Sequence, residues 1–162
     1  MADALTATAQ RVQDALEALG VASQVVELPA STRSAAEAAQ AIGCRLEQIA
    51  KSLVFRGLST NRPVLALVSG ANRVDEERLG ALIAEVVAKA DADYVRQRTG
   101  YAIGGIPPVG HVESLECLID EDLFQYETIW AAAGTPRAVF RLTPADLQRI
   151  TEGRVVSIKA VR

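Results

Sequence analysis

The sequence KSLVFRGLSTNRPVLALV, residues 51–68, contains two short apolar runs, LVF and VLALV, separated by the segment RGLSTNRP. Short runs rich in Val, Leu and Phe that are bounded by Gly, Asn and Pro are typical of β-strands. We therefore expect two strands here, joined by a turn-rich link. Lys51 opens the first strand, where a cation at the rim of the sheet is able to point into a cleft.

On the N-terminal side of this stretch, the pattern predicts short helices and a strand. Ser34 and Glu37 have the spacing of a capping box, in which each side chain bonds the backbone of the other residue, and Gly43 is a typical helix stop. The predicted elements, in order, are a helix ending at Gly20, a strand at 24–28, a helix from Ser34 to about Ala41 and a helical turn at 46–50.

On the C-terminal side, helices and strands again follow one another irregularly. Thr143 and Pro144 are the residues preferred at the cap and in the first turn of a helix. The predicted elements are a helix from Asp75 to about Val87, a helix at 91–98 ended by Gly100, strands at 116–120, 128–133 and 138–142, a helix after Thr143, and a strand at 155–161.

The mixture of short strands and short helices, without regular alternation, predicts an α+β fold with a curved mixed β-sheet flanked by short helices. The chain has 162 residues, of which 49% are hydrophobic, and this is enough to build one continuous core. Because we find no repeat and no low-complexity linker, we expect a single domain over residues 1–162.

Composition excludes several classes of function. The net charge of −3 leaves no broad positive field for non-specific duplex binding, and 4% aromatic residues are too few for a row of base-stacking rings. Cys44 and Cys117 have no CxxC spacing and only His111 accompanies them, so this pattern predicts no zinc site. No apolar stretch is long enough to cross a bilayer, and the N-terminal residues do not resemble a signal peptide, so we expect a cytoplasmic protein without membrane contact.

The least ordinary stretch is GYAIGGIPPVGH, from Gly100 to His111. Its glycines permit close approach of a ligand, while Pro107 and Pro108 stiffen the chain. Backbone N–H groups held in one direction, as in such a loop, stabilise the oxyanion that forms when an ester carbonyl is attacked. The alternative interpretation is a tight surface turn. The stretch matches neither a Walker loop nor GxGxxG after a strand.

Three other polar residues have two interpretations each. The compact ammonium of Lys51 suits a phosphate oxygen, but a strand-end lysine is also commonly solvated. His111 is either a general base or a hydrogen-bonding support for the loop, and we favour the support because no acidic partner is visible. Asp120 is either placed near a substrate amine or caps a short helix, and the cap is favoured.

Taken together, the ordered motifs resemble the YbaK-like aminoacyl-tRNA deacylases, which are related to the editing insertion domain of bacterial prolyl-tRNA synthetase. The similarity runs from about Thr32 to about Ile150. The motifs that carry it are SAAEAA from Ser34, IAKSLVF from Ile49, Thr99-Gly100, and GGIPPVGH from Gly104 to His111.

The resemblance implies a catalytic site in which Lys51 holds the phosphate of the terminal adenosine of the tRNA. The loop Gly104, Gly105, Ile106, Pro107 and Pro108 would position the aminoacyl carbonyl and a water. It also implies a mixed sheet with flanking helices, no metal, no cofactor, and hydrolysis assisted by the ribose hydroxyl of the substrate. The residues we expect to contact the substrate around this site are Ser52, Gly100, Gly110, His111 and Asp120.

The resulting hypothesis is a trans-editing hydrolase that deacylates mischarged aminoacyl-tRNA, with the acceptor end as its partner and a synthetase as a candidate second partner. One alternative is a non-catalytic module that binds aminoacyl-tRNA or a synthetase through the same pocket. Another is a hydrolase of some other small activated ester. Alanine, cysteine, serine, threonine or another small residue all remain candidate acyl groups, since one methylene changes pocket discrimination by only about 1–3 kcal/mol.

Overall fold

The two strands predicted within residues 51–68 lie side by side at the centre of the sheet. A computed structural model describes residues 4–161, and in it β2 (Ile49–Gly57) pairs antiparallel with β3 (Pro63–Ser69). Their register runs from Ala50 opposite Ser69 to Arg56 opposite Pro63. All seven residues of β3 are buried, because helices or loops cover both faces of this central strand.

The complete sheet is mixed, as predicted. Within residues 4–161, the strand order is β1-β7-β6-β2-β3-β5-β8, and β4 is an additional neighbour of β2. The pairs β2–β6, β3–β5 and β5–β8 are parallel, and the remaining pairs are antiparallel. The strands other than β2 and β3 are β1 (Val26–Glu27), β4 (Val87–Lys89), β5 (Glu116–Asp120), β6 (Ile129–Ala132), β7 (Ala138–Leu142) and β8 (Arg154–Val156).

Strand β2 has different neighbours at its two ends on the side away from β3. It pairs with β6 at Ile49 and Ala50, and with β4 from Phe55 to Gly57. Between these contacts, over residues 51–53, no strand of the described chain pairs with β2 on this side. This gap in the sheet leaves room for a cavity beside the central strand.

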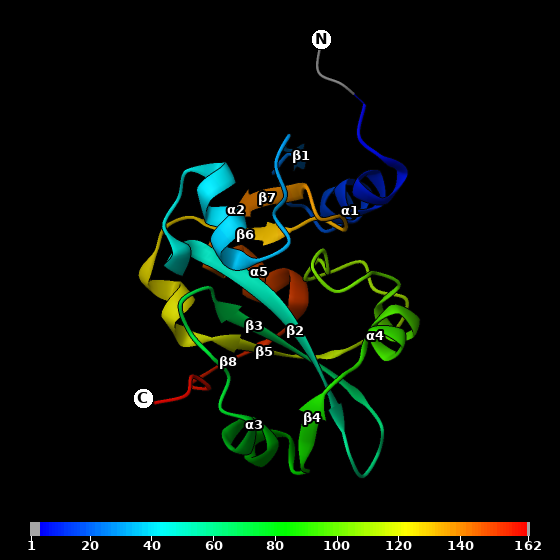
Figure 1. The fold of residues 1–162 in the computed structure, drawn as a ribbon, viewed down its shortest axis with the longest axis vertical. Helices are drawn as coiled ribbons and strands as arrows, with labels where there is room; N and C mark the ends of the chain where they lie inside the picture. Colours follow the sequence, from blue (N-terminus) through cyan, green and yellow to red (C-terminus); the bar gives the residue numbers. More distant parts are fainter. Residues whose placement is uncertain (1–3, 162) are drawn as a thin grey trace.

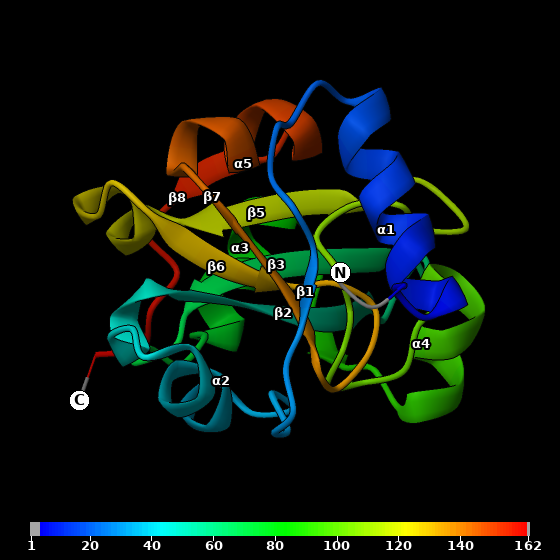
Figure 2. The same cartoon turned by 90° about the horizontal axis from the view of Figure 1, so that it is seen from above.

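Short helices cover the sheet on both faces. One core lies between the sheet and the helices α1 and α5, and a second core joins the opposite face to α3, which lies beside β4 in Figure 1. Figure 2 shows α1 and α5 along one side of the sheet and α2 at the other end of the view. The helices are α1 (Ala7–Ala18), α2 (Ala35–Ile42), α3 (Glu76–Ile83), α4 (Ala92–Thr99) and α5 (Pro144–Thr151), with 3₁₀ turns η1 (Leu46–Gln48) and η2 (Glu121–Gln125).

Several helix boundaries are confirmed because side chains close to them in sequence determine them. The hydroxyl of Ser34 accepts from the N–H of Glu37 at 3.1 Å, and that of Thr143 accepts from Asp146 at 3.1 Å. Gly43 and Gly100 close α2 and α4 in the left-handed conformation, at φ 86° each. The capping box itself is half formed, since the Glu37 carboxylate accepts from the Ser31 hydroxyl instead of from the Ser34 backbone.

Three predicted elements are wrong at their ends. The helical turn expected at 46–50 ends at Gln48, because Ile49 and Ala50 already pair with β6 as the start of β2. The helix expected to reach Val87 ends at Ile83, because the Glu85 carboxylate bonds the β2–β3 connection at Thr60 and Arg62 and the chain then forms β4. The strand expected at 155–161 is β8, which ends at Val156; after it the chain makes only one isolated bridge, to Val74.

Candidate active site

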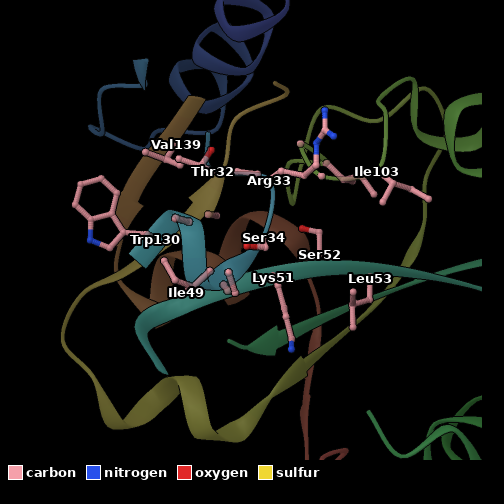
Figure 3. A pocket seen from close by; sticks show the side chains of 18 residues that line it. Thr32, Arg33, Ser34, Ile49, Lys51, Ser52, Leu53, Ile103, Trp130 and Val139 are labelled. Atoms are coloured by element: carbon pink, nitrogen blue, oxygen red, sulfur yellow. The ribbon is translucent and has the colours of Figure 1, made fainter. Parts of the chain in front are cut away.

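A cavity of about 250 Å³ fills the gap beside β2. Segment 32–35 before and in α2, residues 49–53 of β2, the loop 103–106 and residues 130–132 of β6 form its walls, with Ala38 and Val139. Figure 3 shows these walls and the side chains that line them. The structure therefore brings Ser52 together with Gly104, Gly105 and Ile106, which are far from it in sequence, and most of the remaining lining is apolar.

The loop at the cavity is tightly fixed at Gly105. Its carbonyl accepts from the N–H of Gly134 at 2.8 Å, and its own N–H donates to the carbonyl of Ala102 at 3.2 Å. A Cβ built on Gly105 would lie 2.9–3.0 Å from backbone atoms of Thr135, so no side chain fits without moving one of the two segments. The glycine allows the loop to lie directly against the neighbouring backbone.

The main-chain donors of the loop differ in their availability. The N–H of Gly105 is used within the loop, whereas the N–H groups of Gly104 and Ile106 have no hydrogen-bond partner among residues 4–161. Gly104 adopts φ 99°, a conformation that side chains disfavour. The N–H of Ile103, which also lines the cavity, is likewise without a partner in this range. The loop donors that remain available to an oxyanion at the cavity are therefore those of Ile103, Gly104 and Ile106, and not that of Gly105.

The C-terminal half of the loop faces away from the cavity. Pro108, Gly110 and His111 line a second hollow of about 340 Å³ on the other side of the loop, and Pro107 lines neither space. The Nε2 of His111 donates to the carbonyl of Pro107 at 2.7 Å, and the Tyr101 hydroxyl donates to the carbonyl of Gly110 at 3.2 Å. These bonds make this half of the loop a brace for the half at the cavity.

Replacing His111 by alanine is expected to lower the free energy of unfolding by roughly 1–3 kcal/mol, since the buried Pro107 carbonyl loses its donor.

Burial lowers the pKa of His111, and the hydrogen bond to the Pro107 carbonyl offsets part of this lowering. The folded protein therefore resists protonation of this ring. The wild type should therefore lose stability as the pH falls below about 6.5. Thermal melts across this range should show a smaller acid loss for His111→Ala, and an identical loss in both proteins would contradict the prediction.

Gly100 and Asp120 hold elements in place at some distance from the cavity. Gly100 ends α4, and Val112 lies so close that a Cβ on Gly100 would be 2.7 Å from its Cγ2. Asp120 is fully buried, and its carboxylate accepts from the N–H groups of Ser69 and Asp122 at 3.1 and 2.9 Å. Asp120 also accepts from the Asn72 side chain at 2.8 Å. The bond from Asp122 makes Asp120 the cap of η2, and the bond from Ser69 links β3 to β5.

Lys51 and Ser52 lie on opposite sides of β2, because successive side chains of a strand alternate. Figure 3 shows the ammonium of Lys51 below the strand and the hydroxyl of Ser52 above it, on the side of Ser34. The Lys51 Nζ donates to the carbonyl of Gly70 at 3.4 Å. The Ser52 Oγ is buried and has no hydrogen-bond partner among the described residues.

The ammonium of Lys51 has a pKa below the usual value for lysine. The largest cause is burial of the half-buried side chain, and repulsion by Lys89 and Arg73 acts in the same direction, while Asp120 raises the pKa. Lys89 and Arg73 are exposed and make no ion pair within residues 4–161. Three cations therefore gather on this side of β2, a group that sequence reasoning missed because they come from separate elements.

Arg33 is a second residue that the sequence did not single out. It lines the cavity opposite β2, next to the loop at Gly104, and its side chain is exposed. The only available signal was its position directly before the helix cap Ser34. Arginine at a helix start is common on solvated surfaces, so this signal was too weak to select Arg33 from the other arginines.

The remaining sulfur and acidic groups of residues 4–161 include a buried thiol and no cluster of the metal-binding kind. Cys117 is buried, and burial raises the pKa of its thiol to about 12. Residues 4–161 contain no cluster of three or more His, Cys, Asp or Glu side chains that could hold a metal ion. In the same part of the chain, each helix is too short or too polar to cross a membrane.

Three known proteins are similar to this chain over most of its length. A solved structure described as "a putative trans-editing enzyme for prolyl tRNA synthetase" is 49% identical, with a TM-score of 0.92 over 98% of this chain and 100% of that one. "Putative Cys-tRNA(Pro)/Cys-tRNA(Cys) deacylase EbsC" of Enterococcus faecalis (strain ATCC 700802 / V583) is 29% identical over 77% of this chain and 76% of its own. The uncharacterized protein YwhH of Bacillus subtilis (strain 168) is 29% identical over 82% and 84%, respectively.

The family model for the aminoacyl-tRNA editing domain matches residues 29–150, which include the cavity, its loop and β2. The matched range also contains most of both cores of the sheet. The buried core residues outside it lie in α1, at Val21 and Val25, and near the C-terminus at Ile158. The predicted α+β fold with its mixed sheet is confirmed by the structural likeness. The chain belongs to the aminoacyl-tRNA editing domain family.

Proposed function

We propose that this protein hydrolyses the ester bond of mischarged aminoacyl-tRNA in trans, with the aminoacyl group in the cavity beside β2. The observation that carries this proposal is the meeting of the free N–H groups of Gly104 and Ile106 with a small, mostly apolar cavity in a chain of the editing-domain family. A cavity of about 250 Å³ is small, which favours a small acyl side chain.

The chemistry requires positioning more than a side-chain nucleophile. An aminoacyl ester is activated, so an attacking water and stabilisation of the developing oxyanion suffice. Gly104 and Ile106 supply the main-chain donors, while the ribose hydroxyl of the substrate assists the water. The proposed acyl-side contact is Ser52, whose hydroxyl is buried without a partner at the same cavity.

Lys51 is proposed to bind a phosphate near the terminal adenosine. Its ammonium lies on the other side of β2 from Ser52, beside the exposed Lys89 and Arg73. In this arrangement the acyl group and the phosphate occupy opposite sides of the strand. The substrate passes the edge of β2 at residues 51–53 that faces away from β3, where no strand of the described chain pairs. Gly100, Pro107, Pro108, Gly110, His111 and Asp120 then support the site through the backbone contacts described above.

Deacylation of a panel of mischarged tRNAs tests the function. We expect turnover above the spontaneous rate for at least one small acyl group among alanine, cysteine, serine and threonine. Saturable binding of aminoacyl-tRNA without turnover would instead favour a non-catalytic module that binds aminoacyl-tRNA or a synthetase. Turnover of small free esters that uncharged tRNA does not inhibit would favour a different hydrolase.

Alkaline pH is expected to weaken binding of uncharged tRNA. The pKa of Lys51 is lowered, so its ammonium loses its proton at a lower pH than that of an ordinary lysine as the pH rises. The arginine of the Lys51→Arg variant stays positively charged throughout the alkaline range in which lysine loses its proton. Binding titrations at constant ionic strength should show that the affinity of the wild type for uncharged tRNA declines at alkaline pH and that the affinity of Lys51→Arg does not. A decline over the same pH range in both proteins would contradict this prediction.

The whole of residues 1–162 is proposed to act as one editing domain in the cytoplasm, with a synthetase as a candidate partner. Support for one domain comes from α1, which precedes the matched range but packs in the same core as β7 and α5 through Val12 and Leu16. Co-purification of the protein with aminoacyl-tRNA synthetases tests the partner.

A further inference from the structure

Arg33 is held at the mouth of the cavity by its neighbours on both sides. Thr32 is buried, and both its N–H and its hydroxyl donate to the carbonyl of Pro136, at 2.6 and 3.0 Å. Ser34 caps α2. The backbone of Arg33 therefore lies between a contact with the β6–β7 turn and the start of α2.

The aliphatic part of Arg33 lies across Gly104. A Cβ built on Gly104 would be 2.6 Å from the Cγ of Arg33, 3.4 Å from its Cδ and 3.5 Å from its Nε. The side chain thus passes over the loop whose free N–H groups are proposed to bind the oxyanion. Figure 3 shows Arg33 beside Ile103, with the guanidinium directed away from β2.

The guanidinium of Arg33 has no partner among residues 4–161. Other arginines form ion pairs within the protein, namely Arg45 with Glu47, Arg62 with Glu85, Arg98 with Glu113 and Arg149 with Asp146. None of the residues that line the cavity is acidic. Two cations, Arg33 and Lys51, line the cavity, and the Lys51 ammonium lies on the opposite side of β2 from Ser52 and Ser34.

We propose that Arg33 binds a backbone phosphate of the single-stranded acceptor end as it enters the cavity. The planar guanidinium forms paired hydrogen bonds with phosphate oxygens, a geometry that lysine does not reproduce. A phosphate bound there lies near the Arg33 stem and Gly104. The aminoacyl ester on the ribose of the terminal nucleotide is then placed beside the loop. This inference rests on the proposed function, and it adds a second phosphate contact to that of Lys51.

The test compares Arg33→Ala with Arg96→Ala, which removes an exposed, unpaired arginine from α4. Arg33→Ala should raise KM for the preferred aminoacyl-tRNA roughly tenfold with little change in kcat, the loss expected for one charged hydrogen-bonded contact. The slope of log affinity for uncharged tRNA against log salt should fall by roughly 0.7, since one phosphate contact to a single strand is lost. The KM of Arg33→Lys should lie between those of the wild type and Arg33→Ala. Arg96→Ala should match the wild type in KM and in salt slope.

Each other outcome overturns the inference in an identifiable way. Equal KM and equal salt slope in Arg33→Ala and Arg96→Ala would show that Arg33 touches no phosphate. A loss of kcat alone, with an unchanged salt slope, would show that Arg33 acts only by packing on Gly104. If the wild type deacylates no tRNA, the proposed function fails, while the salt slope for uncharged tRNA still decides whether Arg33 binds phosphate.

Discussion

Replacing Gly105 by alanine should lower kcat/KM for the preferred aminoacyl-tRNA by roughly a hundredfold, the loss typical of a displacement of about 1 Å at a reacting centre. A Cβ here would lie 2.9–3.0 Å from the N, Cα and C atoms of Thr135. These are backbone atoms of the turn between β6 and β7, so they do not move aside as a flexible side chain does. The loop must shift instead, and the donors of Gly104 and Ile106 shift with it.

Single-turnover deacylation at saturating enzyme measures this effect directly, because it separates the chemical step from substrate binding. Gly20→Ala is the matched control. Gly20 has φ 77° and lies at the end of α1, where the nearest atom to a new Cβ is 3.9 Å away. This control should lose stability through backbone strain while retaining its deacylation rate. A Gly105→Ala rate within threefold of the wild type would remove the loop from the proposed mechanism.

Lys51→Met is expected to reduce kcat/KM by roughly ten- to a hundredfold, the range for losing one hydrogen bond to a charged group. Methionine retains most of the stem but removes the ammonium, so β2 should keep its packing and its pairing with β3. Because the neighbouring cations Lys89 and Arg73 remain, the loss reports Lys51 itself and not the general positive charge on this side of the strand.

Steady-state deacylation together with binding of uncharged tRNA checks the Lys51 prediction. Most of the loss should appear in KM and in affinity for uncharged tRNA, because the phosphate is present before and after hydrolysis. Lys89→Ala, which removes an exposed charge from the same side, should have a smaller effect. If Lys51→Met has the same kcat/KM for the preferred substrate and the same affinity for uncharged tRNA as the wild type, the assigned phosphate site is wrong.

The elements predicted well from the sequence are those fixed by residues close together in the chain. Ser34 and Thr143 each bond an N–H three residues later, and Gly43 supplies the left-handed conformation that ends α2. These signals are readable because the two interacting groups are adjacent in the sequence. The end of α3 was predicted wrongly because it depends on Glu85, whose partners Thr60 and Arg62 lie in another connection more than twenty residues away.

By itself, the sequence determined the mixed α+β class, the glycine-proline loop and the strand that carries Lys51 and Ser52. Only the tertiary structure decided which side of that strand faces the cavity, which loop donors stay free, and that Arg33 lies over Gly104. The reason is physical: the cavity is formed where segments that are distant in the chain meet, through bonds such as those from Thr32 to Pro136 and from Gly134 to Gly105. Local patterns specify each segment, but long-range packing sets how the segments meet.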